Sequence, residues 1–326
     1  MRSLTITDSP HICDHSTTRR IMLDVIIALI PALIAATLFF GPMVPLLGIV
    51  AVSAAVLSEW VFRRILRRDT SSVFDLTAVI TALIMVLGIP ANTPIWVTAA
   101  SASVAIIVVK QLFGGVGRNL LNPALVGHIV ITLLVAHGAG ESRNFSWLTV
   151  YGTGHPLAMS WLGDLDVHAL ASATPLQLMA DGTQLPTLGE LFLGIHAGVA
   201  GETSILAILL GGGYLIWRRV VSPVIPLAFI GTTLIVVSLA GQNPLVHLLS
   251  GSLVFVAVFM ATDYATSPVS LKGKIVFGIG CGLITALIRL FGPTTEGVSV
   301  ALLAMNLLVP LIDRITLPKA FGRGRG

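Results

Sequence analysis

About ten apolar runs, each near the length of a membrane-spanning helix, constrain this chain more than any other feature of its sequence. A helix needs about 20 mainly apolar residues to cross the hydrocarbon core of a bilayer. Only 10% of the residues are charged, whereas soluble domains carry about 25%. The sequence therefore predicts an all-α integral membrane protein with about ten transmembrane helices, at residues 21–40, 43–62, 73–89, 95–113, 120–137, 203–217, 223–240, 245–262, 274–291 and 297–315.

The basic residues indicate how these helices are oriented. With the N-terminus in the cytoplasm, nearly all of the 19 Lys and Arg residues fall in cytoplasmic segments. Only Arg143, and Arg289 near the end of the ninth run, fall on the outer side. Since cytoplasmic loops carry the excess of Lys and Arg in membrane proteins, we expect both termini to be cytoplasmic.

A long polar interruption divides the runs into two sets of five. An odd number of helices in each set means that the sets insert with opposite topology, as two inverted five-helix repeats. Two polar stretches rich in helix breakers, residues 114–123 and 262–268, support this weakly because each interrupts apolar sequence. The expected organisation is a cytoplasmic segment 1–20, a first repeat 21–137, an outer loop 138–202 in which 188–199 could form a half-helix, a second repeat 203–315 and a cytoplasmic tail 316–326.

The outer loop contains the sequence Ala171-Ser172-Ala173-Thr174-Pro175-Leu176. Proline disfavours the helical region for the residue before it, so Thr174 should be extended and presented outward. An accessible hydroxyl with small neighbours, here Ser172 and Ala173, is what a modifying enzyme needs. The alternative from these residues alone is a connecting loop in which the combination arises by chance.

Several short motifs, in this order and spacing, resemble one family of membrane flavoproteins. This family includes the D subunit of the Rnf electron-transport complex and the B subunit of the sodium-translocating NADH:quinone reductase. The resemblance covers residues 24–313, and the short N-terminal segment is more similar to the Rnf members. The motifs are Asp75-Leu76-Thr77-Ala78-Val79-Ile80-Thr81, Lys110-Gln111-Leu112-Phe113-Gly114-Gly115, Gly117-Arg118-Asn119, Asn122-Pro123-Ala124, Ser172-Ala173-Thr174-Pro175-Leu176, Gly201-Glu202-Thr203-Ser204, Met260-Ala261-Thr262-Asp263 and Ser267-Pro268.

The resemblance implies a redox function. In this family a flavin transferase attaches FMN through its phosphate to a threonine hydroxyl, and the matching residue is Thr174. The family also suggests a second, noncovalent flavin, riboflavin. It implies a subunit that relays electrons between reduced ferredoxin and NAD in a complex that moves Na⁺ or H⁺ across the bacterial cytoplasmic membrane, with the flavin loop in the periplasm. The implied partners are iron–sulfur, membrane and second flavin-carrying subunits, the flavin transferase and membrane lipid, but no nucleic acid.

Two departures from the family's flavinylation sequence keep other functions open. His168 and Ala171 stand where the family has an acidic residue and a hydroxyl. A structural subunit that carries no flavin would keep the fold without modification of Thr174. A secondary transporter or channel without a redox role is a further alternative, because inverted repeats and broken helices are common in such folds.

Ionisable groups within the apolar runs are candidates for an ion route, because a charge inside a bilayer is costly. The acids Asp75, Glu202 and Asp263, with Asn119 and Asn122 as neutral ligands, supply oxygens that suit a hard cation such as Na⁺. The alternative is that each acid caps a helix or pairs with a base such as Arg118 or Lys272.

The remaining candidate residues favour structural roles. Cys13 and Cys281 are far apart and alone, which excludes a four-cysteine cluster within this chain. The triplet Gly211-Gly212-Gly213 lacks the lysine of a phosphate loop, so we expect it to permit close helix contacts. Three histidines in the apolar runs and beside them could relay protons, but a packing role is the expected one. They are His128, His196 and His247.

Overall fold

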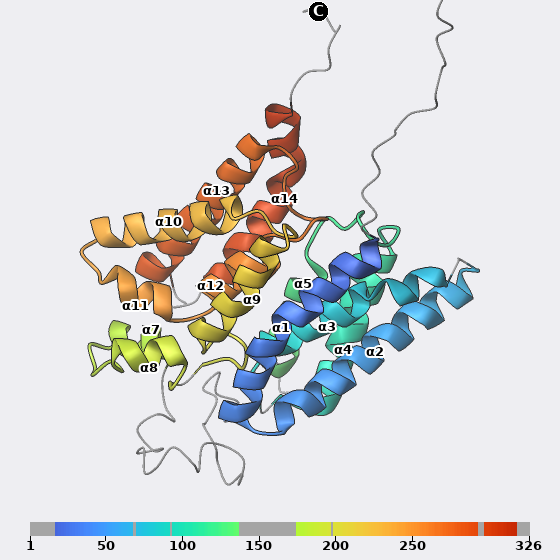
Figure 1. Cartoon of the computed structure of the whole chain (residues 1–326), viewed down its shortest axis with the longest axis horizontal. Coiled ribbons are helices and arrows are strands. Elements are labelled where there is room, and N and C mark those ends of the chain that lie inside the picture. Colours follow the sequence, from blue (N-terminus) through green and yellow to red (C-terminus); the bar gives the residue numbers. More distant parts are fainter. Residues whose placement is uncertain are drawn as a thin grey trace, which may run out of the picture.

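The computed structural model describes residues 17–67, 70–91, 93–136, 174–196, 198–292 and 297–317. Every regular element in these ranges is helical, which confirms the all-α part of the predicted fold class. Helices α1 to α5 form one group and α9 to α14 form the other, with α1 and α9 packed against each other between the groups (Figure 1). The described residues between the groups contribute two short helices, α7 and α8, which lie at one end below α9 and α11 (Figure 1).

The first group consists of two long helices and three shorter ones. Among the residues that the structure describes, four helices are long and apolar enough to cross a membrane, namely α1, α2, α13 and α14. The bounds in the first group are α1 Thr18–Phe40, α2 Met43–Ile65, the 3-10 helix η1 Ser71–Asp75, α3 Thr77–Leu87, α4 Ile95–Val104, the π-helix η2 Ala105–Gln111, which continues α4, and α5 Pro123–Ala136.

The second group contains a helix that is interrupted inside its apolar run. The bounds in this group are α9 Ile205–Trp217, α10 Val224–Leu239, α11 Pro244–Leu249, α12 Leu253–Phe255, the π-helix η3 Val256–Met260, α13 Leu271–Phe291 and α14 Val298–Thr316. The two short helices between the groups are α7 Pro175–Ala180 and α8 Leu188–Leu193. The possible half-helix 188–199 is therefore realised only as the six residues of α8.

The prediction of one continuous helix over residues 245–262 was wrong. The chain leaves the helix at Ser250, which is extended (φ −119°, ψ 141°), and Gly251 adopts a left-handed conformation (φ +70°). Carbonyl groups freed by such a break need internal partners, because the bilayer supplies none. The guanidinium of Arg289 on α13 donates to the carbonyl oxygens of His247 (2.7 Å) and Ser250 (3.3 Å). Arg289 therefore stabilises the break.

The predicted helix at 73–89 also begins later than expected. Residues 71–75 form the 3-10 turn η1, and Leu76 is left-handed (φ +64°) before α3 begins at Thr77. Helix α3 is short and mostly buried. Its last carbonyl group, on Leu87, accepts a hydrogen bond of 2.7 Å from the backbone N–H of Gly201, in the turn that precedes α9. Two interrupted helices, α3 and α11–α12–η3, thus lie within the structure.

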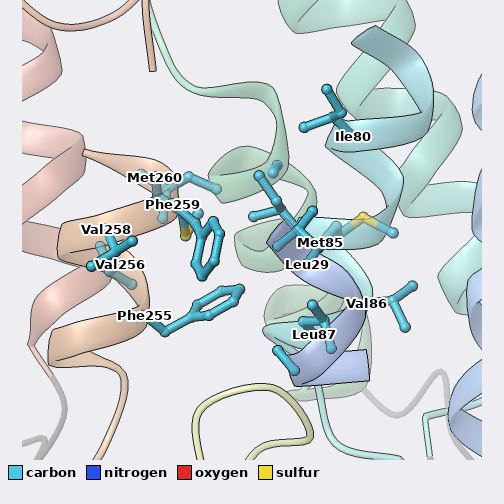
Figure 2. Close-up of a cluster of buried hydrophobic side chains, with 14 of the residues drawn as sticks. Leu29, Ile80, Met85, Val86, Leu87, Phe255, Val256, Val258, Phe259 and Met260 are labelled. Atoms are coloured by element: carbon cyan, nitrogen blue, oxygen red, sulfur yellow. The ribbon is translucent and has the colours of Figure 1, made fainter. Parts of the chain in front are cut away.

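Apolar side chains of these two interrupted helices meet in the core between the groups. Figure 2 shows Phe255 and Phe259 pointing from α12 and η3 toward Leu29 of α1 and Met85 of α3. All four side chains are buried, and the Phe255 and Phe259 ring centroids lie 5.4 Å apart. Removing this much aromatic and aliphatic surface from lipid and water favours the association of the groups through close packing.

The glycine triplet lies where α9 meets α1 and η3, so its predicted role is confirmed for two of the three residues. A Cβ atom on Gly211 would overlap the carbonyl oxygen of Ala28, and one on Gly212 would lie 2.8 Å from Cγ1 of Val258. Gly213 faces open space, with nothing within 4 Å of such an atom. The first two glycines are therefore needed for close approach, and the third is not.

We predict that Gly211→Ala destabilises the protein by about 1–3 kcal/mol, because overpacking forces α1 and α9 apart. Gly213→Ala is the matched control on the adjacent turn and should leave stability unchanged or raise it slightly, since alanine is the better helix former. Thermal unfolding of the detergent-solubilised variants measures both effects. Equal unfolding midpoints for the two variants would show that the α1–α9 contact does not depend on Gly211.

Candidate functional site

Thr174 lies at the start of a short helix, in the conformation that the sequence predicts. It is the N-cap of α7, with extended dihedral angles (φ −66°, ψ 152°), and its hydroxyl oxygen accepts a hydrogen bond of 3.4 Å from the backbone N–H of Gln177. Its side chain is half-buried rather than fully outward, while Pro175 and Leu176 are buried. These two residues anchor α7 and hold the hydroxyl at the edge of the surface. His168, Ala171, Ser172 and Ala173 lie outside the described residues.

A cavity of about 180 Å³ lies between the two helix groups, at the end opposite to α7 and α8. Its walls come from the first half of α3, the start of α1 and α5, the last residues of α9, and the segment after η3. Both π-helices end beside it, at Gln111 and Met260. π-helical turns often occur at functional sites. Three of the predicted ion-route residues are among its lining, namely Asn119, Asn122 and Asp263.

The two asparagines have different environments. Asn122 caps α5, because its Oδ1 accepts from the N–H groups of Ala124 (2.9 Å) and Leu125 (3.3 Å). Its Nδ2 donates to the carbonyl oxygen of Met260 at 3.3 Å, which joins the two groups at the end of η3. The Oδ1 of Asn119 is buried and has no hydrogen-bond partner among the described residues. Asn122 is thus committed to the fold, whereas Asn119 offers a free acceptor to the cavity.

Asp263 mainly stabilises the turn that follows η3. One carboxylate oxygen accepts from the hydroxyl of Thr266 at 3.0 Å, and the other accepts from the N–H of Ala265 at 3.5 Å. The described residues contain no ion pair between Asp263 and either Arg118 or Lys272. These contacts close a turn rather than cap a helix, since the next helix, α13, begins at Leu271, and Asp263 also lines the cavity.

The other two predicted acids do not join Asp263. Asp75 ends η1 and is outside the cavity lining. Glu202 is buried beside the last turn of α3, where its Oε1 accepts from the N–H of Val199 at 3.3 Å. Glu202 therefore lies near the end of α3, whereas the cavity is lined by its first half. In the part of the chain that the structure describes, no three His, Cys, Asp or Glu side chains are placed to hold a metal ion together.

Sequence reasoning missed a buried ion pair on the cavity wall. Lys110 is 2% exposed and Glu59 is 0% exposed. The Nζ of Lys110 lies 2.7 Å from Oε2 of Glu59 and 2.7 Å from the hydroxyl of Thr77, and Gln111 donates to Oε1 of Glu59 at 2.9 Å. Arg63 approaches the same carboxylate at 3.7 Å. Both Glu59 and Lys110 stand inside apolar runs, which is the signal that could have identified them.

A second ion pair joins the two helix groups beside the same cavity. The guanidinium of Arg218, at the end of α9, donates to Oδ2 of Asp24 on α1 at 3.1 and 3.3 Å. The hydroxyl of Tyr214 donates to Oδ1 of Asp24 at 2.8 Å. Asp24 is buried. A carboxylate with three donors fixes how the ends of α1 and α9 align.

The predicted histidines are distributed over the structure rather than arranged in a chain. His247 is buried on α11, with its Nε2 2.6 Å from Oε1 of Gln242. His196 is buried in the turn before α9, and His128 is half-buried on α5, with Nδ1 close to Gly88. These positions favour the packing interpretation over a proton relay.

Comparison with known proteins identifies sequence similarity over nearly the whole chain. The sequence profile of the NQR2, RnfD, RnfE family matches residues 5–322. The chain belongs to this family. It is 40% identical to the D subunit of the Na⁺-translocating ferredoxin:NAD⁺ oxidoreductase complex of Acetobacterium woodii, over 98% of this chain and 96% of that protein.

Two further members of the NQR2, RnfD, RnfE family show similar coverage. The D subunit of the proton-translocating ferredoxin:NAD⁺ oxidoreductase complex of Clostridium ljungdahlii is 34% identical, over 98% of this chain and 97% of that protein. The D subunit of the ion-translocating oxidoreductase complex of Sodalis glossinidius is 33% identical, over 97% of this chain and 98% of that protein. The similarity therefore extends over nearly the whole length of proteins that are named alike.

We predict that Lys110→Met destabilises the protein by about 3–5 kcal/mol, because it leaves the Glu59 carboxylate buried without its closest cation. The double variant Lys110→Met/Glu59→Leu removes both charges and should recover most of this loss. Unfolding midpoints and the yield of monodisperse protein measure the difference. A double variant that is no more stable than the single one would show that the pair does not act as a unit.

Proposed function

We propose that this chain is the membrane-embedded D subunit of an Rnf-type complex, which couples electron transfer between ferredoxin and NAD to ion movement. The full-length similarity to proteins with that name is the observation that carries the proposal. The chain acts within the complex and is not catalytic alone. Electrons reach it from partner subunits and leave to them, and these partners include iron–sulfur, membrane and second flavin-carrying subunits.

We assign the electron relay to FMN joined through its phosphate to the hydroxyl of Thr174. The residues present fit this group, since Thr174 is at the surface edge, the helix after it is anchored by Pro175 and Leu176, and its oxygen makes only one long hydrogen bond among the described residues. The bound flavin supplies one- and two-electron chemistry. The protein contributes position, through α7 and its contacts with α11, and the surrounding dielectric.

A noncovalent flavin, riboflavin, would occupy the cavity between the groups. The fit rests on apolar walls such as Ile84, Val258 and Phe259 together with the unpartnered Oδ1 of Asn119. A flavin ring has polar edges and apolar faces, so this combination suits it. Lys110 and Asp263 would set the local charge around the ring, and Asn122 would keep the cavity closed at the end of η3.

The two groups correspond to inverted five-helix repeats in the bacterial inner membrane. In support of this, an interrupted helix in each group is followed by a similar short sequence, Ala91 to Pro94 after α3 and Ala265 to Pro268 after η3. This order of elements pairs residues 264–268 with 90–94 rather than with 114–123. The basic residues favour a cytoplasmic position for both termini and the cavity, and a periplasmic position for α7 with Thr174.

The coupling ion is not decided by the family, because one relative is named for Na⁺ and another for protons. We retain Asp263, Asn119 and Asn122 at the cavity, Glu202 at the outer end and Asp75 at the entrance to α3 as candidates for an ion route. Since Glu202 lies near the end of α3, whereas the cavity is lined by its first half, an ion that used both would need the interrupted helices to move.

A secondary transporter without redox function is the competing proposal, because its fold would also contain interrupted helices. A flavin-free structural subunit is the other. Both predict an unmodified Thr174, so modification of this residue separates the redox function from the two alternatives.

We predict that the full-length protein, expressed with its flavin transferase, carries covalent flavin that is lost in Thr174→Val. In-gel fluorescence after denaturation and the intact mass measure it, because denaturation removes noncovalent flavin. Thr183→Val, in the same exposed segment, is the matched control and should keep the flavin, and Thr174→Ser should keep at least part of it. An unmodified wild type, given an active transferase, would refute the flavin assignment.

We predict that a single cysteine at Gln177, which is exposed on α7, reacts with a membrane-impermeant maleimide in intact spheroplasts. A cysteine at Lys272, exposed at the start of α13, should react only after the membrane is opened. Cys13 and Cys281 are replaced beforehand to remove the background. The reverse labelling pattern would invert the proposed topology while leaving the family assignment intact.

A further inference from the structure

A second cavity opens at the basic end of the second helix group, next to the α9–α10 turn. Its volume is about 440 Å³. The turn between α9 and α10 forms one side, the segment after η3 forms another, and the first turn of α13 forms the third. It shares a wall with the cavity between the groups, at Val220, Val221, Thr262 and Tyr264. Its remaining polar groups, Arg219, Ser222, Ser267 and Lys274, do not line the first cavity.

Two cations and several hydroxyl groups converge on this cavity. Arg219 comes from the α9–α10 turn and Lys274 from α13, and Ser222 and Ser267 also line the cavity. The hydroxyl of Thr262 is already used, because it donates to the carbonyl oxygen of Val258 at 2.6 Å. The described residues of the lining include no carboxylate. Within the described ranges, neither Arg219 nor Lys274 forms an ion pair, since the observed pairs involve Arg63, Lys110 and Arg218. The cavity therefore presents positive charge and hydroxyl donors without an internal anion.

The position of Arg219 is fixed by the backbone. Arg219 has a left-handed conformation (φ +58°), which is uncommon for a residue other than glycine. The turn around it is closed by a hydrogen bond from its N–H to the carbonyl oxygen of Ile216 (3.0 Å), and the hydroxyl of Tyr264 donates to the carbonyl oxygen of Val220. Together with the hydrogen bond from the N–H of Val220 to the carbonyl oxygen of Leu215 (2.9 Å), this is the capping pattern of a helix C-terminus, which holds the backbone of Arg219 at the rim of the cavity.

Apolar side chains that flank the cavity face outward. Trp217 is 77% exposed at the end of α9 and Leu271 is 62% exposed at the start of α13, while Ile216 is 41% exposed and lines the cavity itself. Tryptophan is enriched at the level of lipid headgroups. The surface thus combines a cationic recess with an exposed apolar flank.

We propose that this cavity binds the headgroup phosphate of an anionic phospholipid from the cytoplasmic leaflet. Arg219 and Lys274 would hold the phosphate oxygens, because guanidinium and ammonium groups form charge-assisted hydrogen bonds with phosphate. Ser222 and Ser267 donate further hydrogen bonds, and the acyl chains lie along Trp217 and Ile216. Basic pockets at the cytoplasmic ends of transmembrane helices bind such headgroups in general. The site is independent of flavin at Thr174.

The test is native mass spectrometry of the full-length, detergent-solubilised protein titrated with phosphatidylglycerol or with phosphatidylcholine. The wild type should retain phosphatidylglycerol in preference to phosphatidylcholine. The double variant Arg219→Asn/Lys274→Gln should bind phosphatidylglycerol about 30-fold more weakly, from the loss of two basic groups near the surface. Asparagine tolerates the left-handed conformation, so the turn is preserved. Lys272→Gln is the matched control, exposed on the same helix turn but outside the lining, and should bind as the wild type does.

Three outcomes would overturn the proposal. First, the double variant could retain phosphatidylglycerol as the wild type does. Second, Lys272→Gln could lose as much affinity for phosphatidylglycerol as the double variant, which would indicate binding by unspecific surface charge. The bound lipid could also be displaced by inorganic phosphate at equal concentration, which would make the site one for a soluble anion. If the double variant fails to fold, Lys274→Gln and Ser222→Ala are measured singly, and unchanged binding in both would likewise exclude the site.

Discussion

The need to pair every backbone group away from water governs the centre of this structure. Two helices are interrupted inside the apolar region, and each interruption leaves carbonyl or N–H groups that lipid cannot satisfy. Arg289 donates to the carbonyl groups of His247 and Ser250 at one break. Gly201 donates to Leu87 at the end of α3, and Asn122 donates to Met260 at the end of η3. Each bond connects segments far apart in sequence, and the bonds from Gly201 and Asn122 also hold the two groups together.

These bonds explain where polar function can be placed. Because α3 and η3 end inside the molecule, the residues that follow or precede them turn back and bring polar side chains to the group boundary. Asp263 follows η3, Thr77 begins α3, and both face the cavity whose wall contains the Lys110–Glu59 pair. A continuous helix would present such side chains to lipid or to the apolar surfaces of neighbouring helices. The start of α3 and the end of η3 therefore border the cavity. The apolar contact of Phe255 and Phe259 with Leu29 and Met85 lies farther along the same helices (Figure 2).

The sequence was informative where the physical cause is local. Pro175 alone constrains Thr174 to be extended, and the lengths of apolar runs identify helices without knowledge of their partners. The break at Ser250 and Gly251 has a local signal too, the sequence Ser-Gly-Ser, which the hydropathy of its surroundings concealed. The Lys110–Glu59 pair could not be derived, because its members are 51 residues apart and either could pair elsewhere. The cavity, likewise, depends on how two groups dock, which no periodicity encodes.

The arrangement of these parts bears on how electron transfer and ion movement could be linked in one subunit. Thr174 lies on the side of α7 and α8, and the cavity lies at the other end of α3, with the apolar core between them. Electrons can cross such a layer without a polar path, whereas a hydrated ion cannot, because its charge would lose its solvent. With the proposed flavins at Thr174 and in the cavity, the same core would let electrons pass between them and would block ions in this conformation. Coupling would then require a redox-dependent shift of α3 or η3, the two elements whose ends are held by hydrogen bonds from Gly201 and Asn122.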